Sequence, residues 1–395
     1  MRFELLSLAL AGLATAADTC TDDVTITELT KQFDCEVVEG LVSVSEELNG
    51  KLVISGAKQF KGGFNVSGVT NLLGIESDSL NSIGGDFLLQ DLNLLTSLKF
   101  TALKSINKLT MRRLKIISGL TFGGSGVSNA TDVEINDCGA LNDLTGLQIT
   151  TVNNLKIINN PSLTKFDSSL VTINETLILT GNGDSFNVKM SDLETAFDIQ
   201  VSDVKSFEVP ALETIGSALR FENNSMIESF EAKNLTLVGK NEKDGGSLSF
   251  NNNKALNNLS FPVLEKINGD LTIVNNTNLT ELSGFPELTD VYGALLLGGS
   301  FEEIDLPKVK SYGGAVTVKS SANISDDDFC SFLDNAKVAG KKSCEANLDE
   351  KDANSKDGKG GDKKGSDDGD SGAATFQLST AAMGLTFFAA VAQLL

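Results

Sequence analysis

The side chains available for chemistry are restricted, because the 395-residue chain contains no His and no Trp. Without His it can form neither a Ser-His-Asp triad nor a Cys-His dyad, and it lacks imidazole as a metal ligand. Acidic side chains outnumber basic ones by 53 to 32, which gives a formal net charge of −21. Nucleic-acid binding needs clustered Lys and Arg to contact phosphates, so this balance excludes a general nucleic-acid binder.

Carboxylates are the remaining candidates for acid–base chemistry. Asp86, Glu134, Asp198 and Asp270 lie beside short apolar runs that are typical of strands. Paired carboxylates on a β-helix could hydrolyse a glycosidic bond, but solvated strand edges carry such residues as well. Asp326 to Asp328 lack the spacing of an EF-hand, and we expect them to begin a helix. No catalytic constellation stands out, so we expect no enzyme activity, no metal and no cofactor.

Four of the five Cys residues form two pairs near the ends of a long repetitive region. Cys20 and Cys35 flank one amphipathic stretch, and Cys330 and Cys344 flank another. In a secreted chain this arrangement predicts two disulfides, each closing a short helical cap. Cys138 is the odd residue. It could be a reactive thiol or an intermolecular link, but its place in the repeat favours a small, buried, free side chain.

Asn-x-Ser/Thr motifs, the acceptors of N-glycosylation, are numerous in the chain. Surface motifs of a secreted protein can carry glycan, and we expect most of them to be occupied. The two closest, at Asn275 and Asn278, are expected to compete. The motifs begin at Asn65, Asn129, Asn174, Asn223, Asn234, Asn258, Asn275, Asn278 and Asn323.

Short apolar–polar–apolar triplets recur every 20 to 29 residues along the chain. Examples are Leu155-Lys156-Ile157, Phe197-Asp198-Ile199 and Leu271-Thr272-Ile273. Such a triplet is a minimal strand with one buried face, and a period in this range is typical of leucine-rich-repeat or β-solenoid arrays. We therefore predict a mainly β, right-handed solenoid of about 13 coils over residues 18–344, with caps at both ends.

Asn recurs three positions after the second apolar residue of several triplets. There the carboxamide is expected to point inward, to satisfy backbone groups of the bend and to stack from coil to coil. Cys138 occupies the same inward position one coil before the first of these Asn residues. Asn223 and Asn275 each lie one residue before an inward Asn and should face solvent. The expected ladder comprises Asn160, Asn182, Asn224, Asn253 and Asn276.

Both ends of the chain carry targeting patterns. Residues 1–17 combine a basic start, an apolar run and small residues, which predicts a secretory signal peptide. Residues 373–395 follow small residues and end in an apolar tail, which is typical of a GPI-attachment signal; a single-pass anchor is the alternative. We expect attachment at Gly372, with Ser371 as the second choice. Residues 345–372 hold nine acidic and five Lys residues, and this composition predicts a disordered stalk.

In this order the features resemble the fungal GPI-anchored cell-wall-organisation glycoproteins, which include the yeast extracellular-mutant and sporulation-specific wall proteins. The resemblance covers Cys20 to Leu395, and its best carriers are Leu80-Asn81-Ser82-Ile83-Gly84-Gly85-Asp86-Phe87, Leu271-Thr272-Ile273-Val274-Asn275-Asn276 and Phe329-Cys330. It implies repeats akin to receptor L-domains and a non-enzymatic role in wall assembly. The stalk departs from the family, because it is rich in Asp, Lys and Gly rather than Ser and Thr, so heavy O-glycosylation there is in doubt.

We therefore expect a structural or interaction protein, held at the outer leaflet of the plasma membrane and in the wall by a GPI anchor. Its long strand surface would face wall polysaccharides or mannoproteins. A cell-surface receptor or adhesin is one alternative, which binding to intact cells would support. A wall-remodelling enzyme is the other, which turnover of glucan, chitin or mannan would support.

Overall fold

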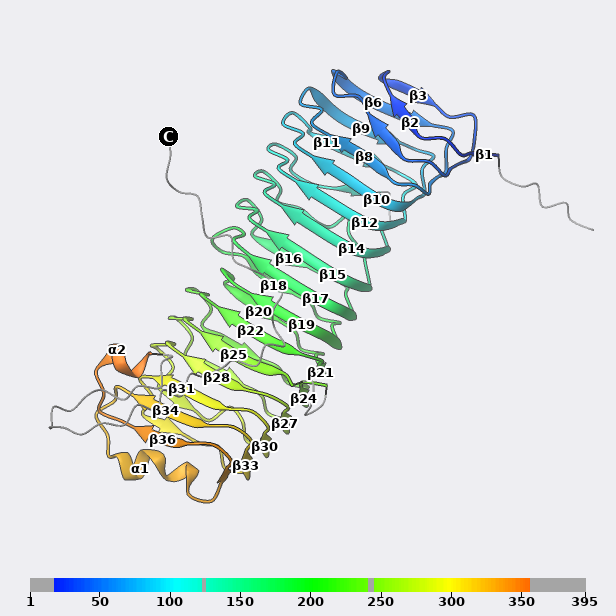
Figure 1. Ribbon diagram of the computed structural model, residues 1–395. Coiled ribbons are helices and arrows are strands. Elements are labelled where there is room, and N and C mark those ends of the chain that lie inside the picture. The colour runs from blue at the N-terminus through cyan, green and yellow to red at the C-terminus, as the bar shows by residue number, and fades with distance from the viewer. Residues whose placement is uncertain (1–17, 123–125, 241–244, 356–395) are drawn as a thin grey trace, which may run out of the picture. The chain divides into compact units, whose positions relative to one another are not determined.

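A computed structural model of the protein describes residues 18–122, 126–240 and 245–355. In them the chain winds through about 13 turns, and each coil pairs its strands in parallel with those of the next (Figure 1). The predicted mainly β solenoid is confirmed. The signal peptide, the GPI segment with Gly372 and Ser371, and residues 356–372 of the stalk lie outside the described residues, so these remain predictions.

One long side of the coils is a 24-stranded parallel sheet. The strands that carry the apolar triplets are β2 (Val24–Ile26), β5 (Val42–Val44), β8 (Phe64–Ser67), β10 (Ser82–Gln90), β12 (Ser105–Arg112), β14 (Asn129–Asn136), β15 (Thr151–Ile158), β17 (Thr172–Thr180), β19 (Thr195–Val201), β22 (Ala218–Glu222), β25 (Ser247–Asn251), β28 (Leu271–Val274), β31 (Leu295–Gly299), β34 (Val316–Ser320) and β36 (Lys342–Glu345). Shorter strands extend this sheet across a bend: β1 (Thr19–Cys20), β4 (Val37–Val38), β7 (Gln59–Phe60), β21 (Thr214–Ile215), β24 (Leu237–Val238), β27 (Lys266–Ile267), β30 (Asp290–Val291), β33 (Ser311–Tyr312) and β35 (Lys337–Val338).

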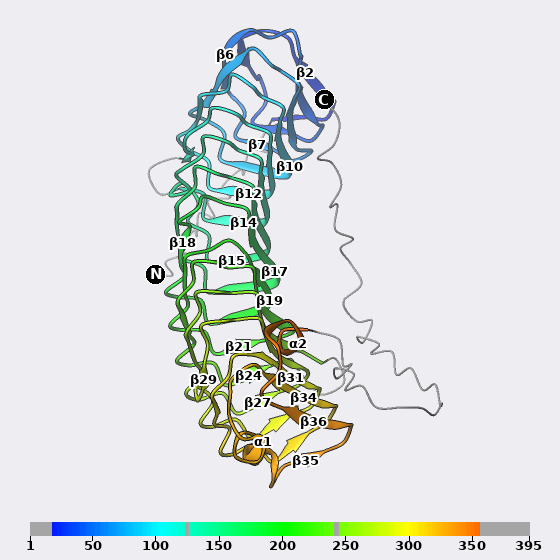
Figure 2. The ribbon, with the colours of Figure 1, turned by 90° about the vertical axis from the view of Figure 1, so that its left-hand side faces the viewer.

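The other side of the coils consists of smaller parallel sheets. In Figure 2 strands β6, β18 and β29 of these sheets lie across the coil from β10, β12 and β17, and the core fills the space between. The strands of this side are β3 (Thr30–Gln32), β6 (Gly50–Ser55), β9 (Leu72–Ser77), β11 (Ser97–Phe100), β13 (Thr121–Phe122), β16 (Lys165–Asp167), β18 (Asn187–Lys189), β20 (Ser206–Glu208), β23 (Ser229–Glu231), β26 (Asn258–Ser260), β29 (Glu281–Leu282) and β32 (Glu303–Ile304).

The triplets build the core because their two apolar residues point inward and stack on those of the next coil. In β15 Leu155 and Ile157 are buried and Lys156 faces outward, and the register places these two residues opposite Leu177 and Leu179. Aromatic rings stack in the same way, with 5.0 Å between the ring centroids of Phe221 and Phe250 and an interplanar angle of 7°. Each coil therefore buries its apolar side against its neighbours.

The structure corrects the sequence reading at one coil. Strand β19 places Ile199 opposite Leu177 and Leu219, so the two inward residues of its triplet are Ile199 and Val201 rather than Phe197 and Ile199. Phe197 is 45% exposed. A shift by two residues preserves the alternation of a strand, so the apolar pattern alone fits both registers and only the pairing with neighbouring coils decides between them.

Disulfides close both ends, linking Cys20 to Cys35 and Cys330 to Cys344. The C-terminal cap contains helix α1 (Asp326–Cys330) and the 3₁₀ helix η1 (Ser331–Leu333).

The N-terminal cap differs from the expected helix. The segment between its two Cys residues forms β2 and β3, and β2 pairs with β5. Val24, Thr25 and Ile26 are β-branched, which favours an extended backbone over a helix. An amphipathic stretch of this length can form either a helix or a strand. Here it forms a strand, because β2 pairs with the open edge of the first coil at β5.

Ordered structure continues beyond the predicted boundary at residue 344. After β36 the chain forms helix α2 (Glu350–Ala353), which lies beside β31 and β34 (Figure 1). Ala353 is fully buried, and its carbonyl oxygen is 2.5 Å from the place of a Cβ on Gly298. Lys319 Nζ donates to Ser355 Oγ at 2.9 Å. Residues 346–355, here called the strap, therefore cover the outer side of these strands, and any stalk begins after them.

The inward Asn side chains form a hydrogen-bonded ladder between coils. Asn253 Oδ1 accepts the backbone N–H and the side-chain Nδ2–H of Asn224, at 3.0 and 2.9 Å. Its own Nδ2 donates to the carbonyl of Phe221 and to Asn276 Oδ1, at 3.0 and 3.1 Å. Asn160 and Asn182 repeat this geometry, and Val204 separates the two runs. Each carboxamide thus satisfies backbone groups that the core would otherwise leave without partners.

A second regularity, overlooked in the sequence reading, lies one residue before each ladder position. These residues adopt left-handed backbone conformations, with φ between 54° and 72°. That region is disfavoured for most L-residues and tolerated best by Gly, Asn and Asp. The recurrence of these three residue types before the ladder position could therefore have predicted the left-handed turn from the sequence. The column comprises Gly68, Asp91, Arg113, Asp137, Asn159, Gly181, Asp203, Asn223, Asn252 and Asn275.

The ladder predicts a large stability effect for Asn253→Ala. This change removes the acceptor of the buried Asn224 backbone N–H and the side-chain donor to the Phe221 carbonyl, which should lower the free energy of unfolding by about 2–4 kcal/mol. The exposed Asn257→Ala is the matched control and should change it by less than about 0.5 kcal/mol. Urea unfolding followed by circular dichroism measures both, and equal midpoints for the two variants would contradict the structural role of the ladder.

Candidate functional site

The outward residues of the long sheet form its largest regular surface. In each triplet strand the residue between the two inward ones lies on the outer side of the sheet, and the strand register aligns these residues in a column. Within the column Thr110, Ile178 and Ser249 are nevertheless buried, with 5%, 7% and 8% of their surface exposed. We call this column and its flanking outward residues, from β10 to β28, the open face. The column contains Leu88, Thr110, Glu134, Lys156, Ile178, Gln200, Arg220, Ser249 and Thr272.

Charges on the open face are paired between neighbouring coils. Arg112 Nε and Nη2 donate to Glu134 at 2.8 Å each, and Arg220 Nη1 donates to both oxygens of Asp198, at 2.8 and 2.9 Å. Pairs that are this exposed stabilise a fold by only about 0–1 kcal/mol. Their larger consequence is local neutrality, on a chain whose net charge is −21.

Three of the four carboxylates considered for catalysis lie in such pairs. Glu134 and Asp198 bind the arginines just described, and Asp86 lies 3.9 Å from Lys108. The fourth, Asp270, accepts the backbone N–H of Ala294 at 2.7 Å. These partners account for the four side chains as charge-balancing and turn-forming groups.

The sequons lie around the coils rather than along the open face. Asn65, on β8 opposite Leu88, is half-buried and marks the N-terminal border of the face. Asn275 is half-buried, and its Nδ2 donates to Asn252 Oδ1 at 2.7 Å. The other seven asparagines are exposed, at strand starts, bulges and turns: Asn129, Asn174, Asn223, Asn234, Asn258, Asn278 and Asn323. None of these seven asparagines belongs to the column of the open face.

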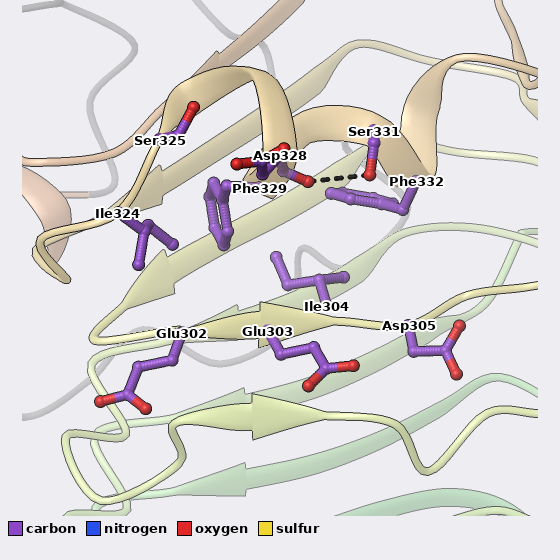
Figure 3. A pocket seen from close by; sticks show the side chains of 10 residues that line it. All are labelled: Glu302, Glu303, Ile304, Asp305, Ile324, Ser325, Asp328, Phe329, Ser331 and Phe332. Atoms are coloured by element: carbon purple, nitrogen blue, oxygen red, sulfur yellow. Dashed lines mark hydrogen bonds between the residues drawn. The ribbon is translucent and has the colours of Figure 1, made fainter.

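A groove of about 600 Å³ lies where the C-terminal cap meets β32. Phe329, Phe332 and Ile324 approach Ile304 across it, whereas Glu302, Glu303 and Asp305 point away from these apolar side chains (Figure 3). The groove therefore borders the apolar contact by which the cap packs on the last coils.

Cys138 is buried and free, and it occupies the first position of the Asn ladder. Its backbone N–H donates to Asn160 Oδ1 at 3.0 Å, and its Sγ donates to the carbonyl of Asn136 at 3.6 Å. Burial raises the pKa of the thiol to about 12, although the Leu114 backbone amide, which donates to the sulfur, acts in the opposite direction. The thiol thus uses the hydrogen-bond positions that a carboxamide fills in later coils.

Within the described part of the chain, no three Asp, Glu or Cys side chains are grouped so that they could hold a metal ion. In the same residues, no helix has the length and apolar character needed to cross a membrane. Phe376 to Leu395, the predicted membrane-directed tail, belongs to the segment outside them.

The fold and this surface define a disulfide-capped β-solenoid with a long, charge-balanced strand face. The chain is 30% identical to the protein ecm33 of Aspergillus fumigatus, over 88% of this chain and 86% of the relative. It is also 30% identical to a cell surface GPI-anchored protein of Arthroderma benhamiae, over 87% of each chain. Sporulation-specific protein 2 of Saccharomyces cerevisiae is 28% identical over 81% of this chain and 64% of that protein.

The chain therefore belongs to the fungal family of ecm33 and sporulation-specific protein 2, as the resemblance in the sequence suggested. No protein-family model matches it. No solved structure matches it either.

The geometry of Cys138 predicts opposite results for two substitutions. Cys138→Asn supplies the donor and acceptor of the ladder and should keep the free energy of unfolding within about 1 kcal/mol of the wild type, whereas Cys138→Ala should lower it by about 1–2 kcal/mol. Urea unfolding at pH 7 measures both. A Cys138→Asn variant as unstable as Cys138→Ala would show that the position does not belong to the ladder.

The raised thiol pKa also predicts a pH dependence. Because an unfolded Cys has a pKa of about 8.5 and burial raises the pKa of the folded thiol to about 12, its contribution to stability is complete below about pH 8.5 and is lost as pH rises. Between pH 8.5 and 9.5 the wild type should lose about 1 kcal/mol more than Cys138→Asn. Parallel unfolding curves at both pH values measure the difference, and equal losses would contradict a buried, protonated thiol.

Proposed function

We propose that this protein is a non-enzymatic, GPI-anchored glycoprotein of the fungal surface that organises the cell wall by binding wall polysaccharides along the open face. The family supports the location, since relatives are named cell surface GPI-anchored protein, cell wall mannoprotein and cell wall protein. Secretion fits the signal-like first 17 residues, and the anchor fits the last 23. Two disulfides fit an oxidising, extracellular setting.

The single observation that carries the proposal is the chemistry of the open face. The half-buried Gln200 and Thr272 offer carboxamide and hydroxyl groups there, on the same surface as mutually neutralised Arg–carboxylate pairs. Neutral polysaccharides are recognised by hydrogen bonds to their hydroxyl groups, and a balanced surface neither repels nor strongly attracts ions. The strand spacing of ~4.8 Å places the outward groups of successive coils at regular intervals along a repeating polymer.

Architecture supports binding rather than turnover. The four carboxylates considered for catalysis interact with Lys, Arg or a backbone amide. An extended chain of sugars lying across several coils would gain from many weak contacts at once, because each further contact is made at high effective concentration.

A glycan placed on the open face tests the proposal. Gln200→Asn creates the motif Asn-Val-Ser with Ser202 on the column of β19. The added glycan should lower binding of the full-length protein to insoluble β-glucan, chitin or mannan by about tenfold or more, which corresponds to about 1.4 kcal/mol. Complementation of a fungal strain that lacks the gene, scored as resistance to wall-perturbing dyes, should fail in parallel.

Lys189→Ser is the matched control, because it creates a motif at the exposed Asn187 on β18, on the other side of the coil. It should bind and complement as the wild type does. Equal binding and complementation by both variants would rule out the open face, and release of reducing sugars by the purified protein would show that it is an enzyme.

A further inference from the structure

Phe197 stands out on the surface of the solenoid. Most of the large side chains at the centre of the coils are Phe rings with almost no exposure, whereas the Phe197 ring is 45% exposed. Exposing an aromatic ring to water forfeits the stabilisation that its burial would give. A surface ring of this size therefore raises the question of what covers it in the mature protein.

The ring is held in a fixed place by the following coil. A Cβ on Gly216 would lie 2.6 Å from Phe197 Cδ2 and 3.3 Å from Cε2, so the ring rests on the backbone where Gly216 has no side chain. The Gly216 N–H donates to the Ala196 carbonyl at 2.9 Å and fixes this contact. Phe197 is thus held at one edge of its ring by the neighbouring backbone, and nearly half of the side chain stays exposed.

The preceding coil places a sequon opposite this ring. In the pairing of β17 with β19, Ile173 faces Ala196 and Thr176 faces Asp198, so Asn174 and Glu175 together oppose Phe197. Ile173 and Ala196 are buried, and the next residue on each strand, Asn174 and Phe197, is exposed. The two side chains therefore leave the sheet on the same side and in adjacent coils, whose spacing is ~4.8 Å.

The carboxamide nitrogen of Asn174 is directed toward β15. Its Nδ2 donates to Asn153 Oδ1 at 2.9 Å, on β15, the strand on the far side of β17 from β19. A carboxamide nitrogen carries two hydrogens, and a glycan attached through it replaces one of them. Because the Asn174 side chain is exposed, the attached sugar lies on the solvent side of β17 and reaches Phe197 by turning across this strand toward β19.

We propose that the first N-acetylglucosamine linked to Asn174 packs the C–H face of its ring on Phe197. Aromatic faces carry partial negative charge and attract polarised C–H groups, and a pyranose ring presents such groups on one face. The covalent link supplies the sugar at high effective concentration. This inference rests on the secretory location in the proposed function, not on polysaccharide binding.

The absence of Trp from the chain allows a direct test. Phe197→Trp introduces a single indole at the proposed contact. In full-length protein from a fungal host, the Asn174 glycan should reduce acrylamide quenching of this indole by about half, because a sugar covers one face of the ring. Thr176→Ala removes the sequon but keeps Asn174, and it should restore full quenching, whereas Thr176→Ser preserves the sequon and should not.

Ile116→Trp is the control, because Ile116 is 42% exposed and lies in another coil. Its quenching should not respond to Thr176→Ala. A second measurement avoids the introduced indole: an endoglycosidase acting on native protein should release the Asn174 glycan about two- to fivefold faster from Phe197→Ala than from the wild type, the ratio expected for one aromatic contact. Release from Asn129 should be unchanged.

Equal quenching with and without the glycan, or equal release rates, would overturn the contact. Peptide mass spectrometry of the same samples separates the two proposals. An unmodified Asn174 alongside other occupied sequons would overturn only the Phe197 contact, whereas nine unmodified sequons would overturn it together with the secretory location.

Discussion

Coil-to-coil register is the constraint on which the rest of this structure depends. A solenoid has no closed core, so every buried side chain and every backbone group of one coil must find its partner in the next. Apolar stacking alone would tolerate sliding by two residues, because the side-chain period of a strand is two. The Asn ladder removes that freedom, since the Asn253 carboxamide bonds to two residues of the preceding coil and one of the following coil.

The ladder also explains why polar residues are present inside the coils. A carboxamide has two donors and two acceptor positions, and Asn160, Asn224 and Asn253 use both kinds of group for backbone and side-chain partners. The turn before each of them needs a left-handed residue to aim the carboxamide inward. The left-handed residue and the ladder residue that follows it therefore act as a unit. Arg113 occupies a left-handed position and forms a bidentate bond to Asp91 of the preceding coil.

Much of the fold could be predicted from the sequence, because the same pattern of apolar residues recurs in every coil and each occurrence supports the assignment of the others. Features that the repeat does not encode were missed. The exposed Phe197 was read as inward because an apolar residue two positions before Ile199 satisfies the same alternation. The strands of the N-terminal cap and the strap on β31 and β34 depend on contacts with open strand edges and faces, which no local composition reveals. Of the candidate surface, the sequons were evident, but their distribution around the coil required the register.

Register finally determines what such a protein can present to its surroundings. Once the coils are locked, outward residues separated by about 22 positions in sequence become neighbours, so a charge on one coil meets its counterpart on the next, as Arg220 meets Asp198. Substitutions can then change one column without disturbing another, because inward and outward columns alternate. A strongly acidic chain can in this way keep one long face neutral and confine its sequons to the edges and turns. Because the coils stack on one another, the solenoid has no closed core. The same stacking gives it a surface whose columns of residues continue along its length.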